Sequence, residues 1–108
     1  MQFDKQAALK ELGVSEDMYD ELLQIFIKQT EITLKNLEAV IKLEDFGQIA
    51  KSAHFINGSA ANLRLEEIRA LAKDIDAQAK GNKDIKIIEE NIRKLKKEFE
   101  EVKIIALK

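Results

Sequence analysis

Hydrophobic residues recur every three or four positions along most of the chain, which is the pattern of amphipathic helices. The pattern is clearest near the C-terminus, where lysine and glutamate fill most of the positions between the apolar ones. The apolar residues of this segment are Ile85, Ile88, Ile92, Leu95, Phe99, Val102 and Ala106. Their spacing predicts a long helix that starts at Asp84 and buries one face in a core, or pairs in a coiled-coil dimer.

Three more stripes of the same kind predict three more long helices. The first of these is expected to begin after the capping residue Ser15 and to run to about Leu43, and the next is capped by Asp45. The following one is expected to end at Gly81 and Asn82. The apolar stripes are Tyr19, Leu22, Phe26, Thr33, Leu37 and Val40; then Phe46, Ile49, Ala53, Ile56, Ala60 and Leu63; then Ile68, Leu71, Ala72, Ile75 and Ala79.

The remaining boundaries follow from local punctuation. A short first helix over about Asp4 to Leu12 is predicted to end at Gly13, a natural left-handed cap. The apolar pattern slips out of register between Leu63 and Glu66, which predicts a turn. Short links force neighbouring helices to run in opposite directions. The sequence therefore predicts an all-α fold with one domain over residues 1–108, an antiparallel up-down-up-down four-helix bundle with a short extra N-terminal helix.

Composition narrows the possible functions. The chain has no cysteine and one histidine, which excludes disulfides and cysteine-type zinc sites and leaves too few ligands for a histidine-rich metal site. Acidic and basic residues are interspersed and the net charge is -2, so a nucleic-acid partner is not expected. No apolar stretch is long enough for a membrane span, and the N-terminus lacks the apolar region of a signal peptide. We expect a soluble cytoplasmic protein.

His54, the single histidine, is the main candidate for chemistry. It lies about 130° around its helix from the middle of the apolar stripe, so it should point outward or along a groove between helices. Its neighbours at helical spacing are mostly small: Ala50, Lys51, Asn57, Gly58 and Ala61. A glycine inside a helix costs about 1 kcal/mol relative to alanine. The expected use of Gly58 is to let another surface approach the imidazole.

One exposed imidazole can act alone as a nucleophile, because its neutral form carries a free nitrogen lone pair. The sequence has no serine elbow, no cysteine nucleophile and no glycine-rich phosphate loop, so a hydrolase or an ATP-using enzyme is not expected. With phosphorus as the electrophile, the product would be a phosphoramidate. The competing interpretation is that a lone histidine on a helix is an ordinary surface residue.

The run Ala53-His54-Phe55-Ile56-Asn57-Gly58-Ser59-Ala60-Ala61-Asn62-Leu63 resembles the signature of the histidine-containing phosphotransfer (HPt) domain family. The short first helix, the segment from Leu22 to Phe26 and residues 66–72 resemble that family too. The resemblance implies a carrier without turnover of its own, in which His54 takes a phosphoryl group from the aspartyl phosphate of a receiver domain and passes it to another receiver.

The resemblance also implies the partners and the metal. Response-regulator receiver domains, or a hybrid sensor histidine kinase, would bind the chain as a monomer. Magnesium would be held by the receiver, and the chain would have no cofactor or metal of its own. Gly58 matches the glycine of the family and would give the receiver clearance, with Asn57, Lys51 and Ala61 supporting the phosphoryl site.

The chain departs from the family pattern at two positions. Asn57 stands where the family commonly has a lysine, and an amide cannot neutralise charge. Our hypothesis at this stage is that Lys51, one turn before His54, supplies the missing cation. Arg64 stands where the family usually has glycine, at the end of the third long stripe's helix, and it could lie at the rim of the docking surface.

A receiver-docking surface is predicted around His54, although the apolar residues assigned to it could equally be core residues of a broad stripe. Ile25, Ile27 and Ile32 lie toward the flanks of the apolar stripe of the helix predicted after Ser15. The sequence does not fix which flank of that helix faces His54. The residues assigned to docking are Ala50, Phe55, Arg64, Ile25 and Ile32.

A second function from a different class stays open. The chain could be a helical interaction module, dimeric through its last helix, in which His54 is inert and Asn57 records the loss of phosphotransfer. The starting methionine and the complete set of helices favour a free-standing protein, although a domain excised from a kinase would look the same. Incubation with a phosphorylated receiver separates a carrier from an interaction module.

Overall fold

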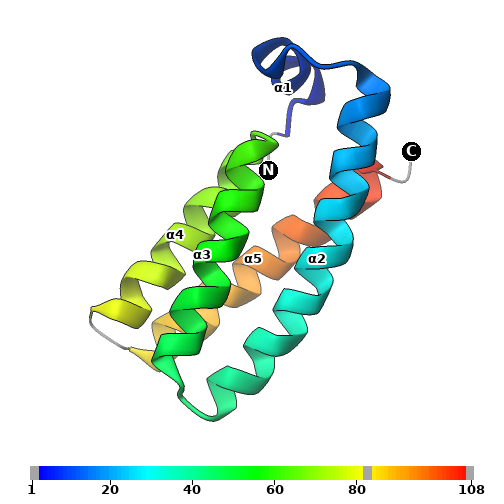
Figure 1. Ribbon diagram of the computed structural model, residues 1–108. Helices are drawn as coiled ribbons and strands as arrows, with labels where there is room; N and C mark the ends of the chain where they lie inside the picture. The colour runs from blue at the N-terminus through cyan, green and yellow to red at the C-terminus, as the bar shows by residue number, and fades with distance from the viewer. Residues whose placement is uncertain (1–2, 82–83, 107–108) are drawn as a thin grey trace.

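The computed structural model describes residues 3–81 and 84–106, which form an elongated helical bundle of 41 × 20 × 20 Å (Figure 1). The predicted up-down-up-down arrangement of the four long helices is confirmed, and so is the short extra helix at the N-terminus. Each boundary falls within two residues of its prediction, except that Asn82 lies outside the described residues. The helices of the described residues are α1 (Lys5–Leu12), α2 (Glu16–Lys42), α3 (Phe46–Asn62), α4 (Glu66–Lys80) and α5 (Ile85–Ala106).

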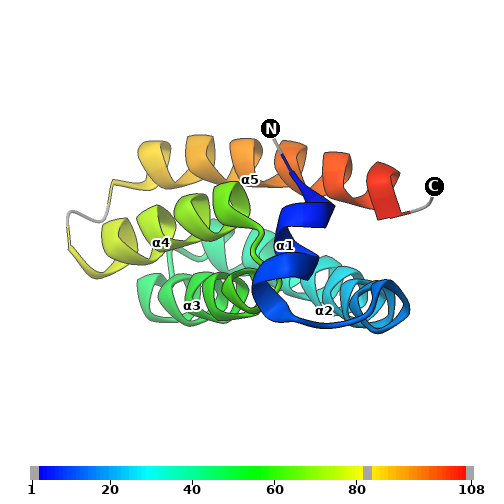
Figure 2. The same ribbon diagram turned by 90° about the horizontal axis from the view of Figure 1, so that it is seen from above.

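The long helices form a closed ring in which α3 contacts α2 and α4, and α5 contacts α4 and α2. The contact between α3 and α4 is the most extensive of these. Figure 2 shows α1 lying across one end of the bundle, where α2 begins and the turn between α3 and α4 is found. The hairpin of α3 and α4 is therefore the most tightly packed pair of helices and the natural place to hold a site rigidly.

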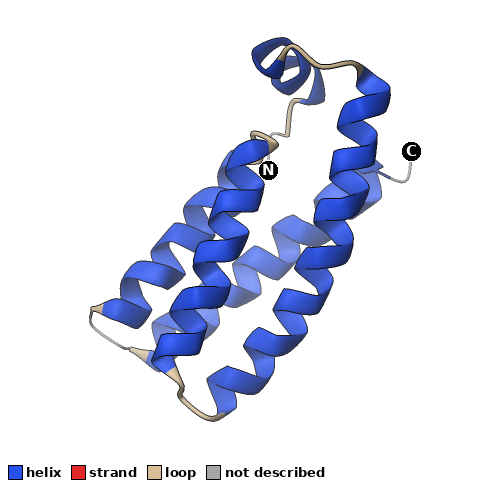
Figure 3. Ribbon diagram, viewed as in Figure 1, coloured by secondary structure: helices blue, strands red, loops and turns tan. Residues whose placement is uncertain are grey.

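Short polar side chains cap the starts of α1, α2 and α3, and the caps of α2 and α3 are those that the sequence predicts. The carboxylate of Asp4 accepts a hydrogen bond from the backbone N–H of Ala7 at 3.0 Å. The hydroxyl of Ser15 and the carboxylate of Asp45 do the same for α2 and α3, at 3.1 and 3.2 Å. The loops between the long helices are short (Figure 3), so these caps fix where each helix enters the bundle.

The predicted buried face of α2 is partly wrong. Leu22 is exposed and Thr33 is only half-buried, whereas Leu23, Thr30 and Leu34 face the core. At about 100° per residue, Leu23 lies about 40° from Tyr19 and Leu22 about 60° from it on the other side. The sequence therefore placed the centre of the buried face slightly to the wrong side of Tyr19, which exchanged the core position Leu23 for the surface position Leu22. The stripes predicted for α3, α4 and α5 are all buried or half-buried.

Tyr19 links α2 to the end of α3 through the core. Its side chain is fully buried, and its hydroxyl donates a hydrogen bond to the backbone carbonyl of Leu63 at 2.7 Å. Burial disfavours the phenolate and raises the pKa of Tyr19 from its ordinary value of 10.0 to about 12. The hydroxyl therefore stays a donor at neutral pH and ties the first turns of α2 to the end of α3.

We expect Tyr19→Phe to lower the free energy of unfolding by about 1–3 kcal/mol, because it leaves the buried carbonyl of Leu63 without this donor. For a domain of this size, each kcal/mol lowers the melting temperature by about 4–8 °C. Thermal unfolding followed by circular dichroism measures the change. Thr30→Val is the matched control, because the buried hydroxyl of Thr30 has no hydrogen-bond partner in the described part of the chain. This second variant should be as stable as the parent or more stable, and equal losses in both variants would contradict the role of Tyr19.

The turn between α3 and α4 has Arg64, not glycine, at the position with a left-handed backbone. Arg64 adopts a left-handed backbone conformation with a φ of 61°, which glycine would adopt without strain. Its guanidinium donates a hydrogen bond to the carbonyl of Ala61 at 2.8 Å, and its Nε lies 3.7 Å from a carboxylate oxygen of Glu11 in α1. These contacts offset part of the backbone strain and hold Arg64 in the turn, at the position where the resemblance leads one to expect glycine.

Candidate functional site

His54 lies in the middle of α3, and its side chain is 75% exposed. Its Nδ1 atom is 3.7 Å from Oδ2 of Asp76 on α4, whose side chain is only 14% exposed. The distance is slightly longer than a hydrogen bond, so the two groups face each other across the seam between the helices. The expected outward position of His54 is confirmed, and the structure adds that the imidazole lies on the side of α3 nearest to α4.

The position of Asp76 follows from the turn between the two helices. In an antiparallel pair, residues equally distant from the turn lie side by side, and both His54 and Asp76 are eleven positions from Leu65. Asp76 follows the buried residue Ile75, so it lies at the edge of the core face of α4. The carboxylate is therefore held close to the protein surface but mostly away from water.

Lys80, one turn after Asp76, completes a row of three ionisable groups. Its Nζ atom lies 3.2 Å from Oδ1 and 3.4 Å from Oδ2 of Asp76. The same carboxylate oxygen, Oδ2, thus faces both the imidazole of His54 and the ammonium of Lys80. This is a compact cluster in which one carboxylate is shared by two nitrogen groups.

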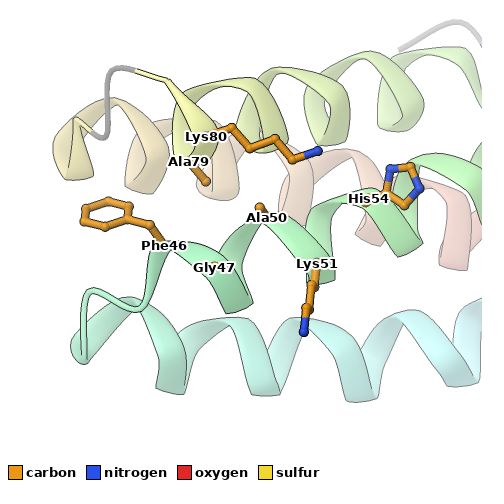
Figure 4. A pocket seen from close by; sticks show the side chains of 7 residues that line it. All are labelled: Phe46, Gly47, Ala50, Lys51, His54, Ala79 and Lys80. Carbon is orange, nitrogen blue, oxygen red and sulfur yellow. The ribbon is translucent and has the colours of Figure 1, made fainter.

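A pocket of about 560 Å³ opens beside the imidazole, between α3 and the end of α4. Figure 4 shows Phe46 at the far end of this pocket and the side chain of Lys80 extending toward His54. In the same view Lys51 points toward α2, away from Lys80. The residues that line the pocket are Phe46, Gly47, Ala50, Lys51, His54, Ala79 and Lys80.

The small residues around His54 are placed differently from one another. Gly58 is exposed, and a Cβ atom built on it would meet nothing within 4 Å, so the surface there is open. Asn57 and Ala61 are half-buried. Ala50 is only 6% exposed and lines the pocket, so it cannot present the exposed docking surface expected of it. The space in front of the imidazole is therefore bounded mainly by backbone and small side chains.

Several apolar side chains on the α2 side of the molecule are exposed. Ile25 is 52% and Ile32 63% exposed, so the alternative that these two are core residues is wrong. Phe55 is 45% exposed and therefore partly buried. Ile27, by contrast, is half-buried against the core.

The ion pairs of α2 show which way these isoleucines face. Glu31 and Glu38 pair with Lys103 and Lys96 of α5, so that flank of α2 faces α5. Ile25 and Ile32 lie roughly 100–140° around the helix from these glutamates. They also lie about 120–140° from the buried Tyr19 and Leu37, so they are on the outward face of α2, turned away from α5.

Arg64 lies at the α1 end of the bundle, ten residues after His54. At a rise of about 1.5 Å per residue, the two are separated by about 15 Å along the helix. A docked partner would have to extend over that distance to reach Arg64, so its assignment to the rim of the docking surface stays a prediction.

The chemistry that the described residues can supply is limited. They contain no group of three histidine, aspartate or glutamate side chains that could hold a metal ion. No helix among residues 3–81 and 84–106 is both long and apolar enough to cross a membrane. What remains is an exposed imidazole whose Nδ1 faces a carboxylate, which leaves Nε2 as the nitrogen available to an electrophile.

Sequence reasoning missed Asp76 and Lys80. The signal that could have found them is the distance of Asp76 from the turn, taken together with the spacing of one helical turn between Asp76 and Lys80. The roles assigned to Lys51, Asn57, Gly58 and Ala61 stay predictions.

Comparisons with known proteins give a family and a similar fold. A family model described as "Hpt domain" matches residues 21–104. The crystal structure of histidine-containing phosphotransfer protein B (HptB) from Pseudomonas aeruginosa PAO1 is similar over 95% of this chain and 89% of that chain, with a TM-score of 0.84. The two sequences are 23% identical, so this likeness shows a common fold. The search of curated proteins found no match.

Proposed function

The chain belongs to the Hpt domain family, and on that premise we propose that His54 accepts a phosphoryl group from the aspartyl phosphate of a response-regulator receiver domain and passes it to another receiver. Hpt phosphotransfer proteins are in general carriers and not catalysts. The observation that carries the proposal is the imidazole itself, which is 75% exposed and has its Nδ1 atom turned toward Asp76.

The transfer step is a substitution at phosphorus. The lone pair on Nε2 of the neutral imidazole attacks the phosphorus atom, and an N–P bond forms. The P–O bond to the receiver aspartate breaks, and its electron pair leaves with the carboxylate. Nδ1 keeps its hydrogen, so the ring of His54 gains one positive charge as the receiver regains its negative one. The reverse sequence delivers the phosphoryl group to a second receiver.

Asp76 is suited to support this step as a positioning residue. A carboxylate beside Nδ1 favours the tautomer that carries hydrogen on that atom, which leaves the lone pair on Nε2. The same carboxylate stabilises the positive charge that the ring of His54 acquires. Because Asp76 is mostly buried, this charge interaction is screened less by water and salt than a surface pair would be.

We propose that the receiver docks over α3 and the exposed flank of α2. Gly58 leaves an open approach to the imidazole, and Phe55, Ile25 and Ile32 give the exposed apolar area that a partner could cover. The receiver supplies the magnesium ion that stabilises the transferring phosphoryl group. Lys51, Asn57 and Ala61 flank the site, and any hybrid sensor histidine kinase would bind through its own receiver domain.

The proposal is tested by incubating the protein with receiver domains from the same genome, each phosphorylated in the presence of magnesium. We expect label on the chain that is labile in acid and stable in base, as a phosphoramidate is, and that maps to His54 by mass spectrometry. A panel of receivers scored by rate identifies the partners and the direction of flow. Absence of label with every receiver would favour the alternative function, a helical interaction module.

A further inference from the structure

A phosphoryl group on His54 creates a problem of charge at this site. It brings up to about two negative charges close to Asp76, whose carboxylate faces the same ring. Asn57, one turn further along α3, is a neutral amide and cannot neutralise them. Lys51 lies on the other flank and points toward α2 (Figure 4). The expected cation has to come from elsewhere.

Lys80 has the geometry that Lys51 lacks. Its side chain extends from α4 toward His54 in Figure 4, and its Nζ atom is within 3.4 Å of the carboxylate oxygen that faces the imidazole. One oxygen atom therefore stands between the ammonium and the ring. The side chain of Lys80 is 65% exposed, so its ammonium can move without being drawn out of the core.

We propose that Lys80 is the cation that neutralises the phosphoryl group carried by His54, and that Asp76 exchanges partners to release it. In the unphosphorylated protein, Lys80 pairs with Asp76. After transfer, the ring of His54 is positively charged with hydrogen on Nδ1 and becomes the partner of Asp76. The ammonium of Lys80 then moves to the phosphoryl oxygens. The exchange makes and breaks no covalent bond and moves no proton, and it rests on the function proposed above.

The pocket leaves room for this movement. Ala50 and Ala79 line it with small side chains, and its volume is about 560 Å³. A lysine has a flexible stem of four carbons and three rotatable donors, so it can follow a charge that appears a few ångströms away. Asp76 keeps a positive partner in both states, which a mostly buried carboxylate requires.

The test begins by loading His54 with phosphoramidate, from which the phosphoryl group passes to the imidazole nitrogen and ammonia leaves. Phosphorus NMR then follows the titration of the phosphoryl group. A nearby cation favours the dianion, so Lys80→Ala and Lys80→Gln should each raise the pH midpoint of this titration by about one unit, a tenfold change in proton affinity. Lys51→Ala is the matched control and should leave the midpoint unchanged.

A second measurement is the rate at which the same variants accept the phosphoryl group from a phosphorylated receiver. We expect a roughly tenfold loss in both Lys80 variants, the size of one charge contact near a protein surface. Their helix content should match that of the parent, with a loss in free energy of unfolding of about 1 kcal/mol or less, because the pair with Asp76 lies at the surface on the Lys80 side. An effect confined to Lys51→Ala, or none in the Lys80 variants, overturns the assignment of Lys80 alone. If neither donor labels His54, the proposed function and this inference fail together.

Discussion

Replacing His54 by glutamine is expected to abolish phosphoryl labelling of the protein, both by phosphorylated receivers and by phosphoramidate. Glutamine is polar and favours helices, but its amide nitrogen has no lone pair free for attack. The side chain of His54 is largely exposed and makes no contribution to the core, so the fold should persist. The measurement is the amount of label on the intact chain by mass spectrometry, with circular dichroism to verify the helices.

Other groups near His54 provide the control for this result. Asp76 could in principle accept a phosphoryl group as an acyl phosphate, which is labile in base, whereas a phosphoramidate is labile in acid. Ser52, two residues before His54 on α3, would give an ester stable in acid. Base-stable, acid-labile label remaining on the glutamine variant would contradict the assignment of His54 as the acceptor.

Much of the fold follows from local signals that the sequence displays openly. Caps at Asp4, Ser15 and Asp45 start their helices by bonds to residues three positions away, so neighbouring residues suffice to predict them. The apolar residues of α5 follow one another at intervals of three and four positions without interruption, and the central ones are buried. The boundaries and the antiparallel order could therefore be predicted without knowledge of any contact between helices.

The phase of α2 could not be predicted with the same certainty, because its apolar residues cover more than one face. Leu22 and Leu23 are adjacent, and only packing against α3 and α5 decides which enters the core. Ile25 and Ile32 lie on an exposed apolar flank beside the buried stripe. The periodic pattern shows only that these residues are apolar and close to the stripe. It therefore could not decide whether Ile25 and Ile32 are buried or exposed.

Within the site, the sequence indicates the imidazole but not the groups that act on it. His54 is unique in the chain, and Gly58 is unfavourable in a helix, so both attract notice by residue type. Asp76 and Lys80 are two charged residues among many, and their importance comes from the pairing of α3 with α4 across the turn. The prediction of Lys51 as the cation considered only the helix that carries His54, so it left out Lys80 on α4.

Substitution of Gly58 should separate folding from phosphotransfer. In the free protein, Gly58→Ala should raise the free energy of unfolding by up to about 1 kcal/mol, because alanine favours helices and its Cβ would meet nothing within 4 Å. Gly47→Ala is a matched control on the same helix, since its Cβ would meet only a carboxylate oxygen of Asp45 at an ordinary 3.6 Å. Thermal unfolding compares the stability of each variant with that of the parent. A gain in Gly58→Ala shows that the glycine at this position lowers the stability of the parent.

The larger variant Gly58→Gln should fold as well as the parent but accept the phosphoryl group from receivers roughly 100-fold more slowly, since a displacement of about 1 Å from the productive geometry can cost that much. Labelling by phosphoramidate, which is small enough to reach Nε2 past a glutamine, should keep its rate. Loss with both donors would mean that the substitution damages the imidazole site itself. An unchanged rate with receivers would contradict docking over Gly58. The open surface beside His54 would then have no role in the approach of a receiver.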